Sequence, residues 1–323
     1  MDVWHSRSQA AKALTSKYGT VAAAIKQCRP YRIPKGFARW DELCTAMAVL
    51  INAVEGVDRA TLLHGHRCGL WLSQNAPLYL VRTAVLRACE HTDIDFAADN
   101  KLLAGLNEPP IRTALFLLPS NALIAPDGGC VDWAVVHISD REHPELSQGE
   151  YELAGNTYRF PWLPHQNDYR YNWQWSTLDT RCSTLFSGFD IANDGSLIQG
   201  PPTLGTSELT GADLEFTHHV RNILLQLLLI ASYQPSLISG EGNPPATPKG
   251  NPPRRSQTRY WQPRVISMPK SELRSPREGK RAGGGSGKRE HWRRGHWRNQ
   301  PVGAGRRSRR LIWIKPMIIG AEP

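Results

Sequence analysis

The sequence predicts an α+β protein: an amino-terminal helical layer on a mixed, mainly antiparallel sheet, with a late core helix and a basic carboxy-terminal extension. Three observations support this fold class. Apolar residues recur every three or four positions in the first quarter of the chain, and the period changes toward two from about residue 113. A long apolar helix is expected at residues 210–233, where Thr210 and Asp213 resemble a capping box. Beyond this helix, basic residues dominate the composition.

Four amino-terminal helices are expected. Apolar side chains spaced by three and four residues mark one helical face within residues 14–25 and another within residues 40–54, with Pro30 between them. A third helix is expected at residues 59–72. A fourth is expected to begin at Pro77, because proline favours the first helical position. Its apolar face would hold Leu78, Val81, Val85 and Cys89.

Strands are expected after these helices, in short apolar or alternating runs bounded by turn residues. The runs lie at residues 115–118, 131–138, 182–191 and 196–199. Residues 151–160 are typical of a hairpin that turns at Gly155 and Asn156. Two more short strands, at residues 260–268 and 311–314, would dock the carboxy-terminal segment on the body.

The most regular strand pattern places four aromatic side chains on one face of residues 169–175. These are Tyr169, Tyr171, Trp173 and Trp175. One interpretation is a groove that binds an extended peptide. The alternative, which the composition favours, is a sheet face packed beneath helices, because aromatic residues dominate protein cores as readily as binding sites.

Charge divides the chain into two unlike parts. Residues 249–323 hold 20 Lys or Arg and 4 Asp or Glu, a net charge of +16, while residues 1–248 hold 19 and 25, a net charge of −6. A stretch rich in Pro, Gly and Asn at residues 240–255 is typical of a linker. We therefore expect a helical region at residues 1–112, a mixed sheet with the core helix at 113–238, and a basic Trp- and Arg-rich tail at 239–323.

The centre of the tail is a tandem repeat in which two His-Trp-Arg triplets are separated by Arg294 and Gly295. Guanidinium groups neutralise phosphates and indole faces stack on unpaired bases, so the repeat predicts contact with mRNA or the ribosome. The residues expected to bind are His291, Trp292, Arg293, Arg294, His296, Trp297, Arg298, Arg309 and Arg310. Structural roles are expected for Gly295, Trp313 and Pro316. The alternative is a solvated charge run.

Two other functions remain open. RNA cleavage without a metal needs a general base, a general acid and a cation, and His291, His296 and Arg294 supply these types. A simple nucleic-acid-binding protein of a phage or plasmid is the second. No phosphate-binding loop, GxSxG elbow or HExxH motif occurs, and the His and Cys alternation at residues 64–68 lacks a second ligand pair. We therefore expect a protein that is not an enzyme and has no cofactor and no metal.

Cysteine usage predicts the compartment. The six cysteines are scattered without a CxxC pair, and no basic segment followed by an apolar run opens the chain. The most apolar stretch, residues 223–231, is about half of the ~20 residues that span a bilayer. Free thiols in the cytoplasm of a bacterial host, with no membrane contact, are expected.

The tail resembles that of a broad family of phage and plasmid proteins, the type V-A anti-CRISPR family. Its pattern is roughly HxRRGHW, a Gly-rich spacer, and R-h-x-W-h-x-P, where h is apolar. The first part matches Arg293, Arg294, Gly295, His296 and Trp297, and the second matches Arg310, Trp313 and Pro316. The layout of the body is similar to that of the family, including an LP step at Leu118 and Pro119.

The resemblance implies a regulator encoded by a mobile element. Such a protein recognises the nascent amino-terminal peptide of a CRISPR effector nuclease, or of another host protein, at the ribosome. It then promotes decay of the encoding mRNA, with host nucleases as further partners. A basic RNA- or ribosome-binding tail suits that place of action.

Overall fold

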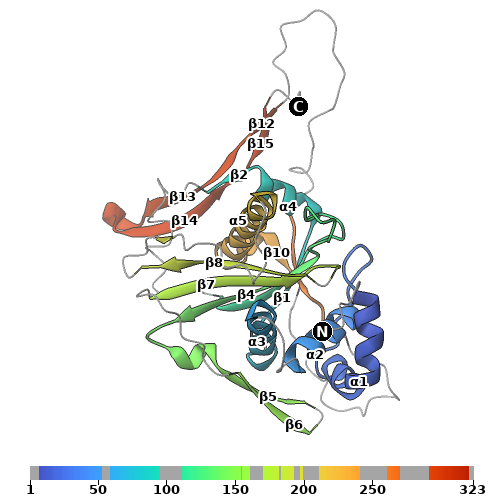
Figure 1. The fold of residues 1–323 in the computed structure, drawn as a ribbon. Helices are drawn as coiled ribbons and strands as arrows, with labels where there is room; N and C mark the ends of the chain where they lie inside the picture. The colour runs from blue at the N-terminus through green and yellow to red at the C-terminus, as the bar shows by residue number, and fades with distance from the viewer. Residues whose placement is uncertain are drawn as a thin grey trace, which may run out of the picture.

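The chain folds around one eight-stranded sheet with helices on both faces, as the computed structural model in Figure 1 shows. The structure describes residues 7–52, 59–94, 111–153, 155–160, 170–181, 183–192, 197–198, 211–240, 260–269 and 291–319. Most neighbouring strands are antiparallel, so the α+β class expected from the sequence is confirmed.

The large sheet gathers strands from distant parts of the chain. Its spatial order is β10 (Ile238–Ser239), β11 (Arg264–Ile266), β1 (Leu78–Val81), β3 (Thr113–Leu117), β4 (Trp133–Asp140), β7 (Tyr171–Leu178), β8 (Thr184–Ile191) and β9 (Leu197–Ile198). Strand β1 runs parallel to both of its neighbours, β11 and β3, and all other neighbouring pairs are antiparallel. The strand expected at residues 260–268 is thus present as β11.

One face of the sheet is covered by the amino-terminal layer. This layer consists of α1 (Arg7–Cys28), α2 (Trp40–Asn52) and α3 (Arg59–Ser73). The side chains of Trp133 in β4 and Leu115 in β3 point into a core shared with Trp71 of α3. Three of the expected amino-terminal helices are therefore confirmed.

The opposite face is covered by α4 (Thr83–Glu90), α5 (Gly211–Tyr233) and β-strands near the carboxy terminus. Every residue of 223–231 in α5 is buried, which confirms the expected core helix. Within residues 223–231 the one amide side chain, Gln226, donates from Nε2 to the carbonyl oxygens of Cys89 at 2.9 Å and Thr92 at 3.3 Å. Thr210, half of the expected capping box, lies outside the described residues.

The expectation that a helix begins at Pro77 is wrong. Residues 78–81 form β1, and α4 begins only at Thr83. All four residues of β1 are buried, and both faces of this strand are covered. A short run that is apolar throughout fits a buried strand as well as a helix, and the neighbouring strands β3 and β11 decide between them.

Two smaller elements complete the body. Strands β5 (Gly149–Leu153) and β6 (Asn156–Phe160) form the expected hairpin, and Gly155 turns it with a positive φ of 78°. Short 3₁₀ turns η1 (Pro144–Ser147) and η2 (Pro235–Leu237) connect other elements. Within the described residues, no helix has both the length and the hydropathy needed to cross a membrane.

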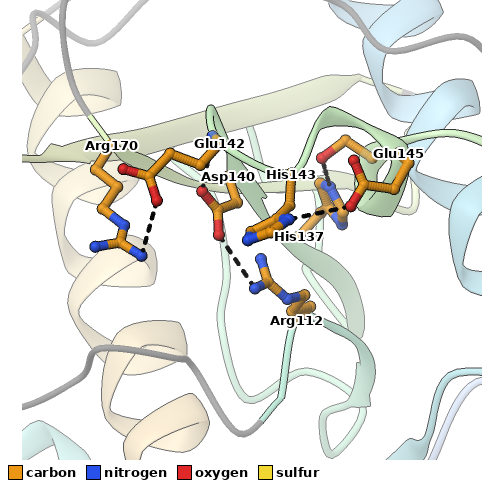
Figure 2. A network of polar contacts seen from close by, with 8 residues as sticks. Arg112, His137, Asp140, Glu142, His143, Glu145 and Arg170 are labelled. Atoms are coloured by element: carbon orange, nitrogen blue, oxygen red, sulfur yellow. Dashed lines mark hydrogen bonds and ion pairs between the residues drawn. The ribbon is translucent and has the colours of Figure 1, made fainter.

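A polar network ties together the ends of β3, β4 and β7 (Figure 2). The buried Asp140 accepts from Arg112 Nη2 at 3.2 Å and from the backbone N–H of Glu142 at 3.0 Å. Glu142 in turn pairs with Arg170 at 3.2 Å. Asp140 thus satisfies donors from two segments, and its removal leaves both without an acceptor.

Asp140→Ala is therefore expected to lower the free energy of unfolding by about 2–3 kcal/mol, measured by urea denaturation, because it strands a largely buried guanidinium. The matched control is Glu142→Ala in the same network. The Glu142 side chain is 60% exposed, whereas that of Asp140 is 1% exposed. The control should therefore cost about 0–1 kcal/mol. Equal losses in the two variants would contradict the role given to Asp140.

Candidate nucleic-acid interface

The carboxy-terminal strands form one long antiparallel ribbon, here called the basic ribbon, residues 291–319. Strands β13 (Gly295–Val302) and β14 (Ser308–Ile314) pair along their length, with the 3₁₀ turn η4 (Ala304–Arg306) at the tip. Beyond them β12 (His291–Arg293) pairs with β15 (Met317–Ile319). Figure 1 shows the basic ribbon in red at the edge of the molecule.

The basic ribbon has two chemically different faces. Its register places Trp297 opposite Trp313 and Arg298 opposite Ile312, and residues directly opposite each other share a face. Trp297, Leu311 and Trp313 are buried in the same core cluster as α5. His296, Arg298 and Arg310 alternate with them and are exposed. Period-two alternation therefore turns the indoles inward and the cations outward.

A small anchor cluster joins the basic ribbon to the body. The rings of Trp297 and Trp313 stack with centroids 5.9 Å apart and an interplanar angle of 14°. Trp313 Nε1 donates to Thr92 Oγ1 at 3.2 Å, and that hydroxyl donates to the carbonyl oxygen of Ala88 at 2.7 Å. Thr92 lies in β2 (Thr92–Asp93), which pairs in parallel with the start of β13.

Gly295 is the tightest point of this anchor cluster. Its N–H donates to the carbonyl oxygen of His91 at 2.9 Å. A Cβ at this position would lie 2.7 Å from both Pro316 Cδ and Thr92 Oγ1, and 2.8 Å from the carbonyl oxygen of Ile314. Gly295, Trp313 and Pro316, expected to be structural, therefore meet where the ribbon crosses β2.

The burial of Trp297 corrects one sequence expectation. Its side chain is 2% exposed and lies against Trp313, so it cannot stack on a base while the ribbon stays folded. The sequence predicts ligand contacts from every member of the His-Trp-Arg repeat. In a strand, however, successive side chains point to opposite faces, so only some of them are exposed. The expectations for the side chains of Trp292 and Arg309 lie outside the described residues.

The cations on the outer surface form the candidate interface. Exposed basic side chains are His291, Arg293, Arg294, His296, Arg298, Arg306, Arg307 and Arg310. The turn at the tip has positive φ at Gly303, Gly305 and Arg306. This sharp turn carries Arg306 and Arg307, which the sequence reasoning did not single out. These two arginines lie outside the His-Trp-Arg repeat, which is the pattern that predicts the interface.

Arg294 pairs with the Asp93 carboxylate of β2. Both side chains are more than half exposed, so the ion pair is worth only about 0–1 kcal/mol. A phosphate of comparable charge competes with such a carboxylate at low cost. Asp93 and Thr92 carry no motif, and only the pairing of β2 with β13 reveals their role.

The two histidines proposed for RNA cleavage lie on either side of Gly295, His291 in β12 and His296 in β13. These strands belong to different small sheets. In the described part of the chain, no group of three or more His, Cys, Asp or Glu residues is arranged to hold a metal ion. His64, His66 and Cys68 lie on helix α3.

Burial also decides between the two interpretations of the aromatic strand. Tyr171, Trp173 and Trp175 of β7 are buried in the core beneath α5, and Trp173 stacks on Phe189 of β8 with centroids 5.4 Å apart. Their face is therefore no open peptide groove, and the packed alternative holds. Tyr169 lies outside the described residues.

The family model of AcrVA2-like proteins, the anti-CRISPR type V subtype A2 family, matches residues 96–321, which is more than half of the 323-residue chain. The chain belongs to this family. The match spans β3 to β15 and includes α5 and the basic ribbon, while α1 to α4 precede it.

Among solved structures, the crystal structure of AcrVA2 is similar, with 14% sequence identity and a TM-score of 0.40. The alignment covers 95% of this chain and 96% of that one. No curated protein sequence matches at a significant level.

Gly295→Ala is expected to detach the basic ribbon from the body. The new methyl group meets Pro316, Thr92 and the Ile314 carbonyl at once, and two of these contacts involve backbone or a rigid ring. We expect a loss of about 1–3 kcal/mol in the free energy of unfolding. Trypsin should also cut within residues 291–319 sooner than in the wild type.

Gly211→Ala is the matched control. A Cβ on Gly211, the first residue of α5, meets nothing within 4 Å. This variant should therefore match or slightly exceed the stability of the wild type, because alanine favours a helix by up to ~1 kcal/mol over glycine. Wild-type behaviour of Gly295→Ala would show that the close approach at Gly295 is relieved without loss.

Proposed function

We propose that this member of the anti-CRISPR type V subtype A2 family silences its target at the ribosome. The basic ribbon binds mRNA or ribosomal RNA, and the body recognises the nascent peptide of a CRISPR effector nuclease or of another host protein. Decay of the encoding mRNA by host nucleases follows. The observation that carries this proposal is the outward row of cations on a ribbon whose other face is anchored in the body.

Charge supports contact with RNA at the carboxy-terminal part of the chain, which contains the ribbon. Residues 249–323 carry a net charge of +16, and residues 1–248 carry −6. Phosphate contacts at exposed guanidinium groups release counterions, so they favour association strongly at low salt. The acidic body repels the same phosphates, which directs a polyanion to the ribbon.

Burial of the indoles limits the nucleic-acid contacts that the ribbon can make. Because the Trp297 ring is buried, the exposed Arg and His side chains are the groups of its described residues proposed to contact RNA. Contacts to phosphate position a nucleic acid but carry no sequence information. Selection of one transcript therefore requires a second recognition event, and a nascent peptide supplies it because it identifies the message being translated.

This function needs no catalytic step by the protein itself. The ribbon holds RNA near the ribosome, and cleavage is left to host nucleases in the bacterial cytoplasm. The division of labour gives separable variants: changes in the ribbon alter RNA binding, and changes in the body alter target choice.

The double variant Arg298→Gln and Arg310→Gln should weaken binding to single-stranded RNA and to ribosomes. Each lost phosphate contact lowers the slope of log affinity against log salt by about 0.7 for single strands, so the slope should fall by about 1.4. Filter binding across a potassium chloride series measures it. The fold should be unaffected, because both side chains are exposed.

Arg159→Gln is the matched control, since this arginine lies on β6 of the body and is 80% exposed. An equal loss of slope in this control would contradict a localised interface. RNA recovered from the same reactions in the presence of EDTA should be full length. Shortening that disappears in His291→Ala or His296→Ala would instead establish cleavage by the protein.

Recoding the target separates peptide recognition from RNA recognition. Synonymous changes in the first codons of a silenced gene alter the message but not the peptide, so silencing should persist. Changes in the encoded amino acids should relieve silencing, measured by transcript half-life with and without the protein. Relief by synonymous changes alone would mean that the protein reads RNA sequence.

A further inference from the structure

Arg221 on α5 is a buried cation that forms no ion pair with a described residue. Its side chain is 3% exposed, and its guanidinium carbon lies 4.4 Å from the ring centroid of Phe189 in β8. Nε and Nη1 are both buried and have no hydrogen-bond partner in the structure. Burial lowers the pKa of Arg221 to about 10, so the group stays protonated at neutral pH.

Two more polar side chains share this face of α5. His218 and Asn222 stand three residues before and one residue after Arg221, and the spacings of three and four group His218 with both on one helical face. His218 Nε2 and Asn222 Oδ1 are also buried without a partner. Burial and then the charge of Arg221 lower the pKa of His218.

Arg29 shows how the same fold treats a buried arginine that serves packing. Its exposure is 5%, and its guanidinium carbon lies 4.3 Å from the ring centroid of Trp71. These values match those of Arg221. Yet Arg29 donates from Nη1 to the Trp71 carbonyl at 3.1 Å and from Nη2 to the Ala76 carbonyl at 2.5 Å. Nε of Arg29 also lacks a partner, but both of its Nη atoms are bonded, whereas Arg221 forms no hydrogen bond with a described residue.

A buried charge that lacks a partner destabilises a protein unless a bound group compensates it. The Phe189 ring lies against the Arg221 guanidinium, and Phe189 itself stacks on Trp173. The guanidinium is thus packed on that side, while its Nε and Nη1 donors have no partner among the described residues. His218 and Asn222 are only half-buried, so the cluster extends toward the surface on their side.

We propose that Arg221, His218 and Asn222 form a receptor for a carboxylate group of a partner peptide. A carboxylate fits the planar fork of a guanidinium with two parallel hydrogen bonds. It is also small enough to reach a side chain this buried, whereas the phosphate of a polynucleotide brings its bulky backbone to an acidic body. The Asn222 amide presents either NH₂ or oxygen after a half-turn, and neutral His218 donates one N–H.

The anion receptor stands on the geometry of α5, and only the source of the carboxylate, a peptide, rests on the proposed function. The test uses full-length protein and sodium acetate as the probe. Its melting temperature is compared with that in sodium chloride and sodium phosphate at equal ionic strength. We expect acetate to raise the melting temperature of the wild type above its value in chloride, and to leave that of Arg221→Met unchanged.

In chloride alone, Arg221→Met should melt about 2–4 °C above the wild type, because methionine fills similar space without a buried charge. Arg29→Met is the matched control and should melt lower than the wild type, since it loses two bonded donors and strands two carbonyl oxygens. A drop in Arg221→Met as large as in Arg29→Met would overturn the proposal by showing a structural role.

Other outcomes are equally decisive. An acetate effect of the same size in wild type and Arg221→Met would show general salt stabilisation and overturn the receptor. A phosphate effect larger than the acetate effect, lost in Arg221→Met, would assign the site to nucleic acid and overturn the carboxylate. Failure of the proposed function is seen separately, because ribbon variants and recoded targets do not use acetate or Arg221.

Discussion

Burial of the large sheet on both faces is the constraint on which the rest of the structure depends. The amino-terminal layer covers one face, and α5 with the inner side of the basic ribbon covers the other. Neither face is left for a ligand. Aromatic residues along β7, which form an attractive groove in isolation, therefore become core. The contacts proposed above lie instead at the cluster around Arg221 on α5 and on the outer side of the ribbon.

The same constraint explains why the described segments of the basic tail are folded. Strand β11 pairs with β1 in the large sheet. The anchor cluster of Thr92, Gly295, Trp297, Trp313 and Pro316 holds the basic ribbon against β2. Thr92 connects three segments: its hydroxyl meets Trp313 and Ala88, and its carbonyl oxygen accepts from Gln226. Cations on an anchored strand are held at fixed spacing, which a free tail does not achieve.

Local patterns predicted the elements whose own sequence decides them. The apolar length of α5 and the Gly155 turn between β5 and β6 need no distant partner to be recognised. Strand β1 is assigned to a helix by its own sequence because its four apolar residues suit either structure, and only paired strands 37 and 185 residues away resolve them. Trp297 was misplaced for a related reason: the sequence shows a strand's alternation but not which side meets the body.

Arginine performs two opposite tasks in this molecule, and solvent decides which. In the proposed function, the exposed guanidinium groups of the ribbon attract polyanions through a screened field, which favours association rate and affinity but gives little choice of partner. At Arg221, the surrounding apolar groups remove that screening, so only a group that meets the geometry of the fork repays the loss of water. The proposed function calls for both kinds of arginine. In it, the exposed arginines provide attraction to RNA in general, and Arg221 provides discrimination among peptides.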